Sequence, residues 1–214
     1  SLVQWNGGDA VGQIFYNLFH KKKSSLGISL GIRSLYKGDL PGGGTGIGRA
    51  VAIRLAQEGA KVIVTSRSAK RVASARAALE EISSGHGGYV CDIAEDLAPT
   101  AMLKQVYEDH GYPDIVVNNV GDTLGILDPL CPLDDWAKLF RLILGVAIEI
   151  NNEVIPHMKL RSWGRIVNIT AGAGMENSGP VPYSSLKAAF TAYSRSMARV
   201  LALEKTGIVM SAVL

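Results

Sequence analysis

The sequence predicts an α/β fold, in which a doubly wound parallel sheet is covered by helices on both faces within a single domain. From residue 42 onward, short apolar runs rich in β-branched residues alternate with longer stretches of helical periodicity, as in strands joined by crossover helices. The run 114–117 is almost wholly apolar, which is typical of a strand buried on both faces of a parallel sheet. Ligands of such sheets bind at the carboxyl ends of the strands, so we expect the functional site there.

The individual elements follow from local patterns. A glycine loop runs into a helix that ends near Glu58, and residues 26–32 alternate with a period of two, which makes them a candidate first strand. The other strands are expected at 61–65, 88–91, 114–117, 165–169 and 208–213, and the other helices at 69–82, 98–110, 134–159 and 183–203. We therefore divide the chain into an N-terminal extension, 1–40, and a domain over 41–214.

Composition excludes several classes of protein. With 214 residues, 47% of them hydrophobic and 19% charged, the chain is suited to one compact domain with a sizeable core. No apolar run reaches the roughly 18 residues of a membrane span, and a net charge of +3 does not indicate a nucleic-acid partner. The two cysteines, Cys91 and Cys131, form neither a disulfide framework nor a zinc motif. We expect no metal site and a reducing, cytoplasmic location.

A glycine loop, 42–48, directly precedes a helical pattern. Glycines let the backbone turn tightly and approach a pyrophosphate, and the helix N-terminus adds N–H donors and a partial positive charge. The loop is not a P-loop, because no Lys-Ser or Lys-Thr pair closes it, and Ile47 occupies the last glycine position of GxGxxG. The arrangement is GxxxGxG, from Gly42, Gly46 and Gly48.

This loop resembles that of the short-chain dehydrogenases/reductases, in which it reads TGxxxGIG. The resemblance covers roughly residues 42–214 and implies a Rossmann-like fold that binds a nicotinamide dinucleotide through Gly42, Gly46, Ile47 and Gly48. Pro41 stands where the family has Thr, and residues 35–40 do not look like an apolar strand leading into the loop. Either the first strand is displaced, or residues are missing from the sequence.

The residues after the strand 61–65 indicate which dinucleotide is bound. Ser66 and Arg67 follow about twenty residues after the loop, where an acidic residue favours NAD and a cation favours a 2′-phosphate. Arg67 has planar donors suited to phosphate, so NADP(H) is expected in preference to NAD(H). In the resemblance, Asp92 contacts the adenine, and the segment from Asn118 to Gly121 corresponds to the family's NNAG.

The catalytic candidates are Tyr183 and Lys187. Their i and i+4 spacing places a phenol and an ammonium on one face of a helix. A free tyrosine has a pKa of roughly 10, and a nearby lysine together with an oxidised nicotinamide favours the phenolate. Tyr183 could then act as a general acid or base, and in the family the lysine also holds the cofactor ribose.

Two further positions depart from the family's pattern. A serine after the strand 165–169 polarises the substrate carbonyl in the family. Aligning on the strand places Ala171 at that position, whereas counting back from Tyr183 favours Thr170, which we take as the third catalytic candidate. The family's helical asparagine, which supports a proton-relay water, falls at Ile143.

The resemblance implies an NADP(H)-dependent oxidoreductase that transfers hydride between nicotinamide and a carbonyl or secondary alcohol, with a 3-oxoacyl thioester among the candidate substrates. The alternative is a catalytically impaired nucleotide-binding or scaffolding homologue of the same fold. By analogy with the family, we expect a homo-oligomer, either a dimer or a tetramer. If the chain ends at Leu214, the family's C-terminal lid and last strand would be missing.

Overall fold

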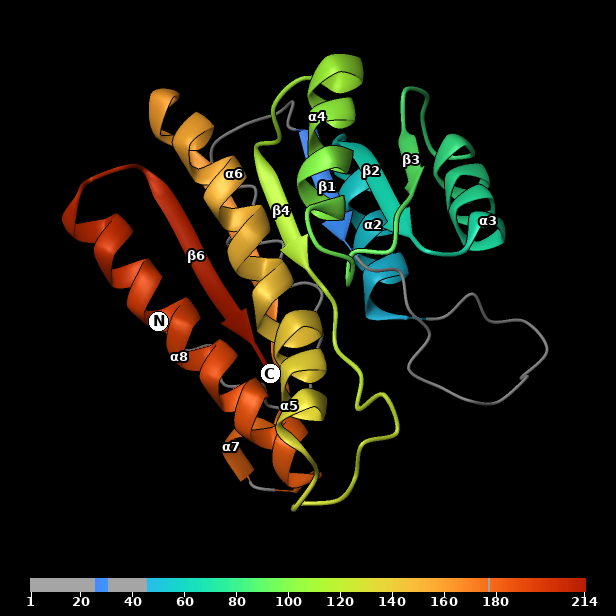
Figure 1. Cartoon of the computed structure of the whole chain (residues 1–214). Coiled ribbons are helices and arrows are strands. Elements are labelled where there is room, and N and C mark those ends of the chain that lie inside the picture. The colour runs from blue at the N-terminus through green and yellow to red at the C-terminus, as the bar shows by residue number, and fades with distance from the viewer. Residues whose placement is uncertain (1–25, 31–45, 177) are drawn as a thin grey trace.

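A six-stranded sheet forms the centre of the molecule (Figure 1). The computed structural model describes residues 26–30, 46–176 and 178–214. All neighbouring strands are parallel, in the order β3-β2-β1-β4-β5-β6, which confirms the doubly wound sheet expected from the sequence. The strands are β1 (Leu26–Leu30), β2 (Lys61–Ser66), β3 (Gly87–Val90), β4 (Ile115–Asn118), β5 (Gly164–Ile169) and β6 (Ile208–Val213).

Helices connect the strands. They are α2 (Ile47–Gln57), α3 (Ala69–Glu80), α4 (Ala98–His110), α5 (Leu133–Phe140), α6 (Val146–Leu160), α7 (Ala173–Glu176) and α8 (Val181–Leu203). A π-helical turn, η1 (Arg141–Gly145), lies between α5 and α6, so the single helix expected over 134–159 contains an irregular turn. The short helix α7 was not expected from the sequence.

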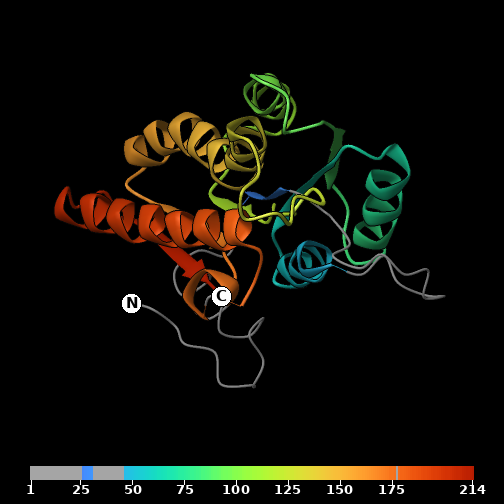
Figure 2. The ribbon, with the colours of Figure 1, turned by 60° about the horizontal axis from the view of Figure 1, so that its bottom comes forward.

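Two hydrophobic cores lie on opposite faces of the sheet because successive strand residues point to opposite sides. In β2, Ile63 joins the core that contains residues of α4, α6 and α8. Its neighbours Val62 and Val64 join the core that contains residues of α2 and α3. Figure 2 shows α4, α6 and α8 together on one side of the sheet and α2 on the other.

The candidate first strand is confirmed. β1 lies between β2 and β4, with Ile28 opposite Ile63 on one side and Val116 on the other. It therefore belongs to the central sheet, although it falls within the expected N-terminal extension. Pro41 and Gly42 lie outside the described residues.

Two observations apply to the described part of the chain alone. None of its helices is long and apolar enough to cross a membrane. None of its His, Cys, Asp and Glu side chains form a group of three or more that could hold a metal ion.

Candidate active site

A pocket of about 350 Å³ opens where β2, β3 and β4 end. This is the sheet edge at which ligands bind in open parallel sheets. Its walls come from the ends of the three strands, the loops that follow them, the helices α3 and α5, and the turn η1. The lining residues are Thr65, Ser66, Arg67, Arg71, Cys91, Asp92, Ile93, Ala94, Asn119, Val120, Leu124, Lys138, Arg141 and Leu142.

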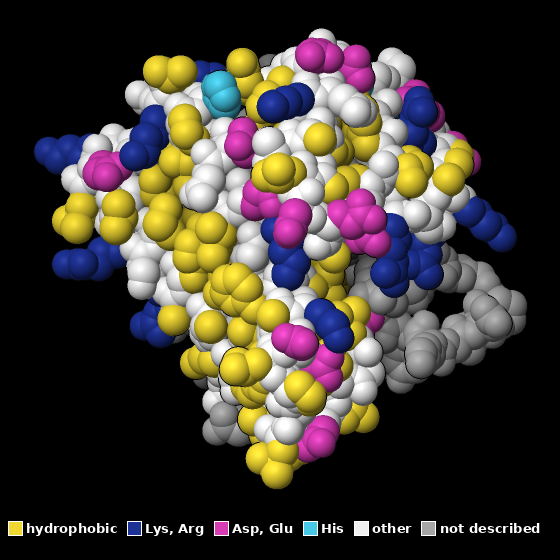
Figure 3. Space-filling model, in the orientation of Figure 1, with side chains coloured by type: hydrophobic (Ala, Val, Ile, Leu, Met, Phe, Trp, Pro, Cys, Tyr) yellow, Lys and Arg dark blue, Asp and Glu magenta, His cyan; other side chains and the backbone are white. Residues whose placement is uncertain are grey.

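One end of the pocket is cationic. Arg67 follows β2, and Arg71 lies in the first turn of α3. The Ser68 side chain caps that helix by accepting a hydrogen bond from the Arg71 backbone N–H at 3.4 Å, and the first turn holds no acidic residue. Figure 3 shows Lys and Arg side chains gathered near the ends of β2 and β3. Sequence reasoning identified Arg67 but missed Arg71, although its position four residues later at a serine-capped helix start was an available signal.

The inner part of the pocket has polar groups suited to a bound ligand. Thr65 is 1% exposed, and its hydroxyl has no hydrogen-bond partner among the described residues. A buried polar atom without a partner is uncommon in native structures, so a ligand that supplies one fits this site. Asp92 lies in the wall, where its Oδ1 accepts a hydrogen bond from the Ala94 backbone N–H at 3.1 Å. Burial, followed by the charge of Asp92, raises the pKa of the Cys91 thiol, so this cysteine is kept protonated.

The described part of the glycine loop forms the start of α2. Gly46 is the N-cap residue, Ile47 is 44% exposed and Gly48 is buried. Within the described residues, the first turn has no acidic side chain and the N-cap makes no side-chain hydrogen bond. This helix start is therefore electrostatically suited to an anion.

Tyr183 and Lys187 lie on the first two turns of α8 and face the same space. The Lys187 ammonium nitrogen is 5.8 Å from the centre of the Tyr183 ring. Lys187 is only 3% exposed, and its Nζ donates to the backbone carbonyls of Ile169 at 3.0 Å and Val120 at 3.4 Å. The lysine therefore joins α8 to the ends of β4 and β5, which places the pair at the same sheet edge as the pocket.

Burial affects the two groups in opposite directions. It lowers the pKa of Lys187 from 10.5 to about 8, because the charged ammonium loses solvation. It raises the pKa of Tyr183, and the nearby carboxylate of Asp122 raises it further. Burial and the Asp122 carboxylate therefore oppose the phenolate, so the charge of Lys187 and positive charge on a bound ligand would be needed to stabilise it.

The NNAG-like segment is divided between two environments. Asn118 is 3% exposed, and its Nδ2 donates to Asn168 at 2.8 Å and to Asn151 at 3.3 Å. Asn118 thus belongs to a buried network, whereas its neighbour Asn119 lines the pocket. Gly121 lies against Lys187: a Cβ added at this glycine would be 2.7 Å from Nζ.

The remaining catalytic candidates occupy different surroundings. Thr170 is 5% exposed, and its hydroxyl donates to the Val213 carbonyl of β6 at 2.8 Å. This bond uses the hydroxyl hydrogen, so polarising a substrate carbonyl would require the bond to break. Ala171 has no hydroxyl. Ile143 is 1% exposed in the turn η1 and belongs to an apolar cluster against which Tyr183 packs.

Comparisons with known proteins agree with this geometry. The family model described as short chain dehydrogenase matches residues 40–214. The chain is 34% identical over 178 residues to the (2S)-[(R)-hydroxy(phenyl)methyl]succinyl-CoA dehydrogenase subunit BbsD of Thauera aromatica, which covers 81% of this chain and 69% of that protein. It is 33% identical over 159 residues to the 3-oxoacyl-acyl-carrier-protein reductase FabG of Pseudomonas aeruginosa, which covers 74% of this chain and 64% of that protein.

A solved structure of a dehydrogenase is also similar to this chain. The crystal structure of NAD⁺-bound xylitol dehydrogenase superposes with a TM-score of 0.73 at 26% identity, and the match covers 90% of this chain and 70% of that one. The match to FabG spans less than two thirds of that relative. The family match over most of the chain, the parallel sheet with its pocket, and the paired Tyr183 and Lys187 together lead to one conclusion. The chain belongs to the short-chain dehydrogenase/reductase family.

Proposed function

We propose that this protein is an NADP(H)-dependent oxidoreductase that transfers hydride between the nicotinamide and a carbonyl or secondary alcohol. The observation that carries the proposal is the pairing of Tyr183 with the buried Lys187 beside Gly121. This pair lies at the sheet edge that also holds the pocket. A proton donor and a dinucleotide site at one edge are the two parts that carbonyl reduction requires.

The cationic end of the pocket supports NADP(H). Arg67 and Arg71 could both pair with a 2′-phosphate, since guanidinium groups bind phosphate through planar, charge-assisted hydrogen bonds. The serine-capped start of α3 adds a partial positive charge at the same place. NAD(H) is the alternative, since xylitol dehydrogenase was crystallised with NAD⁺.

The chain's own residues supply proton transfer and positioning. When bound, the nicotinamide supplies the hydride that reaches the carbonyl carbon. Tyr183 Oη donates its proton to the carbonyl oxygen, and the C=O bond becomes a C–OH bond. With a pKa of about 8, Lys187 carries its charge at pH 7, and this charge favours the phenolate that remains on Tyr183. Thr170 stays a candidate for polarising the carbonyl, on the condition that its hydroxyl leaves the Val213 carbonyl.

The names of two relatives support an acyl thioester as the substrate class. One is a dehydrogenase of a substituted succinyl-CoA and the other is a 3-oxoacyl-acyl-carrier-protein reductase. Both names describe an acyl group carried on a thioester. We therefore place 3-oxoacyl thioesters first among the substrates to be assayed.

The first experiment is a fluorescence titration with NADPH and with NADH at the same salt concentration. We expect tighter binding of NADPH, and we expect Arg67→Ala and Arg71→Ala each to weaken NADPH binding while leaving NADH binding nearly unchanged. Arg195→Ala removes an exposed arginine of α8 that does not line this pocket and serves as the control. Equal binding of the two cofactors by the unmodified chain would overturn the NADP(H) assignment.

The alternative function, a nucleotide-binding homologue with impaired turnover, is supported by Ala171, Ile143 and the engaged hydroxyl of Thr170. Tyr183→Phe separates the two functions, because it removes the proton donor and keeps the ring. Loss of carbonyl reduction with unchanged NADPH binding supports the enzyme. The control is Tyr193→Phe, which removes a hydroxyl that accepts a hydrogen bond from Asn151. If the unmodified chain binds NADPH but reduces no carbonyl substrate, the impaired homologue is the better description.

A further inference from the structure

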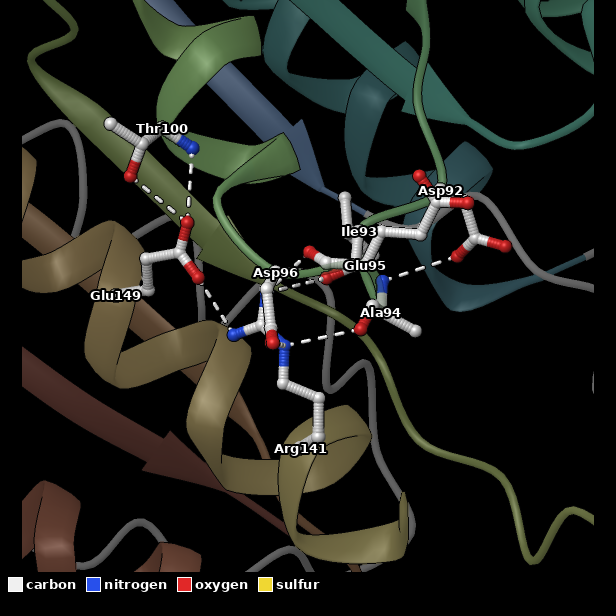
Figure 4. A network of polar contacts seen from close by, with 8 residues as sticks. All are labelled: Asp92, Ile93, Ala94, Glu95, Asp96, Thr100, Arg141 and Glu149. Atoms are coloured by element: carbon white, nitrogen blue, oxygen red, sulfur yellow. Dashed lines mark hydrogen bonds and ion pairs between the residues drawn. The ribbon is translucent and has the colours of Figure 1, made fainter.

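Arg141 joins the turn η1 to the loop that follows Asp92. Its guanidinium donates hydrogen bonds to three successive backbone carbonyls of that loop, from Nε to Ala94 at 3.1 Å and from Nη2 to Ile93 at 3.3 Å and Glu95 at 2.7 Å. Figure 4 shows the side chain reaching from the helix to the loop. Five donors in a fixed plane suit arginine for this contact, whereas a lysine ammonium cannot reproduce the fork.

Glu149 of α6 holds the other side of the guanidinium. Its Oε2 lies 2.7 Å from Arg141 Nη1, and both side chains are mostly buried. Its Oε1 accepts hydrogen bonds from the backbone N–H and the hydroxyl of Thr100, at 3.1 and 2.9 Å. Glu149 therefore fixes both Arg141 and the first turn of α4. Asp96 contributes little, because it is 3.4 Å from Arg141 Nε with a side chain that is 93% exposed.

The loop between β3 and α4 is closed by local turn bonds, from the Glu95 N–H to the Asp92 carbonyl and from the Ala94 N–H to Asp92 Oδ1, both at 3.1 Å. Leu97 precedes α4 with φ of 60° and makes no side-chain cap for the helix. A leucine in the left-handed region is strained and persists when its surroundings hold it. Arg141 binds the carbonyls of residues 93–95, just before Leu97, and Glu149 binds Thr100, just after it, so the two side chains hold the chain on both sides of this residue.

This loop forms one wall of the pocket. Asp92, Ile93 and Ala94 all line it, as does Arg141, whereas Glu149 is not among the described lining residues. We infer that Arg141, held by Glu149, is a positioning residue that fixes the loop 92–96 for binding the adenosine half of the cofactor. The inference rests on the proposed dinucleotide function and extends it to two residues that sequence reasoning did not single out.

The first test compares Arg141→Met, Arg141→Lys and a matched control, Arg161→Met. Arg161 also binds two successive loop carbonyls, those of Tyr112 and Pro113, and lies 3.7 Å from Asp114, but it does not line the pocket. The probe is adenosine 2′,5′-bisphosphate, titrated by calorimetry. We expect the Kd to rise about tenfold in Arg141→Met, since hydrogen bonds from a charged donor are lost. It should also rise in Arg141→Lys and stay unchanged in Arg161→Met.

The variant Glu149→Gln distinguishes two roles of Glu149: holding Arg141 in position, and acting on the ligand directly through its negative charge. Removing a negative charge near an anionic ligand strengthens binding through electrostatics alone. Loosening Arg141 would instead weaken binding, because the loop 92–96 would no longer be fixed. We therefore expect the Kd for the bisphosphate to rise, and a fall in Kd would overturn the inference.

Steady-state kinetics separate an effect on binding of the adenosine half of the cofactor from an effect on the chemical step at the nicotinamide. For Arg141→Met we expect the KM for NADPH to rise with kcat at saturating NADPH within about twofold, because a residue that affects only binding leaves kcat unchanged. A fall in kcat at constant KM would place the effect at the catalytic end and overturn the inference.

If the unmodified chain binds neither NADPH nor the bisphosphate, the proposed function fails and the inference fails with it. If it binds both and Arg141→Met behaves like Arg161→Met, only the inference fails.

Discussion

The Lys187 ammonium occupies the space in which a side chain on residue 121 would lie. An ideal Cβ on Gly121 would be 2.7 Å from Lys187 Nζ, 2.9 Å from its Cε and 3.9 Å from the Tyr183 hydroxyl. Contacts below 3.0 Å are essentially never seen for real Cβ atoms. A side chain at residue 121 would therefore displace the Lys187 ammonium from its present position.

Gly121→Ala should reduce turnover more than it reduces cofactor binding. The added methyl group would displace Lys187 from the carbonyls of Ile169 and Val120, and misplaced catalytic groups lose about tenfold or more in rate. The measurement is kcat with a carbonyl substrate, beside the Kd for NADPH. Gly172→Ala is the control, because the atoms nearest to its Cβ would be those of the Glu176 side chain, at an ordinary contact distance of 3.6 Å or more. Equal activity of the Gly121→Ala variant and the unmodified chain would contradict the packing argument.

Lys187→Met should abolish activity and yet stabilise the fold at pH 7. Burial lowers the pKa of Lys187 from 10.5 to about 8, so the charged form costs folding free energy. Each pKa unit corresponds to about 1.4 kcal/mol. Methionine removes that cost but leaves two carbonyls without their donor, so we expect a net gain of about 1 kcal/mol.

The pH dependence of this gain has a definite sign. Below pH 8 the lysine is charged in both the folded and the unfolded chain, and the full cost is present. Between about 8 and 10.5 the folded lysine is neutral while the unfolded one is still charged, so the cost shrinks as pH rises. Urea unfolding at pH 7 and pH 9.5 measures the difference between the two proteins. If the stability gain of Lys187→Met grew with pH, burial would not be destabilising the charged form of Lys187.

Much of the fold could be predicted because the sequence signals of its helices and strands are local. The helix α4 begins and ends at the predicted residues, with Pro99 in its first turn and Gly111 directly after it, which are standard start and stop signals. β6 also matches its predicted range. The π-helical turn 141–145 gave no signal, because its residues have ordinary helical character and the extra residue in the turn depends on tertiary packing.

The site was predictable to the extent that it depends on local spacing. Tyr183 and Lys187 share one helix face because of their i and i+4 spacing. The hydroxyl direction of Thr170 depends on the pairing of β5 with β6, and the burial of Asn118 depends on its contacts with Asn151 and Asn168. None of these long-range contacts could be predicted from a spacing motif.

Asp122→Asn should lower the pKa of Tyr183, because the variant removes the carboxylate that raises it alongside burial. Asparagine keeps an Oδ1 that can accept the Leu124 backbone N–H, now bonded at 2.9 Å. We expect the limb of the kcat/KM profile that reports Tyr183 to shift toward lower pH. Asp128→Asn is the control, because Asp128 makes the same kind of bond to Leu130 N–H, at 2.8 Å, in the same loop. An identical shift in both variants would show that Asp122 has no particular effect on Tyr183.

His86→Asn should make the fold less sensitive to acid. His86 is 4% exposed, its Nδ1 accepts the Val62 backbone N–H at 3.0 Å, and its Nε2 lies 2.9 Å from the Ser83 hydroxyl. Burial lowers its pKa from 6.5, against the opposing charge of Glu80. Above pH 6.5 the ring is neutral in both states, and as pH falls below 6.5 the unfolded chain binds the proton first, so stability is lost.

Asparagine offers an acceptor near the position of Nδ1 and does not titrate. The free energy of unfolding of the unmodified chain should therefore fall more steeply between pH 6.5 and pH 5 than that of His86→Asn. Urea unfolding across this range measures both slopes, and subtracting one from the other removes the contribution of the carboxylates. His157→Asn, which removes a ring stacked on Tyr112, controls for the loss of a histidine elsewhere. Parallel slopes for the unmodified chain and His86→Asn would mean that His86 has the same pKa in the folded and unfolded chains, so that burial does not lower it.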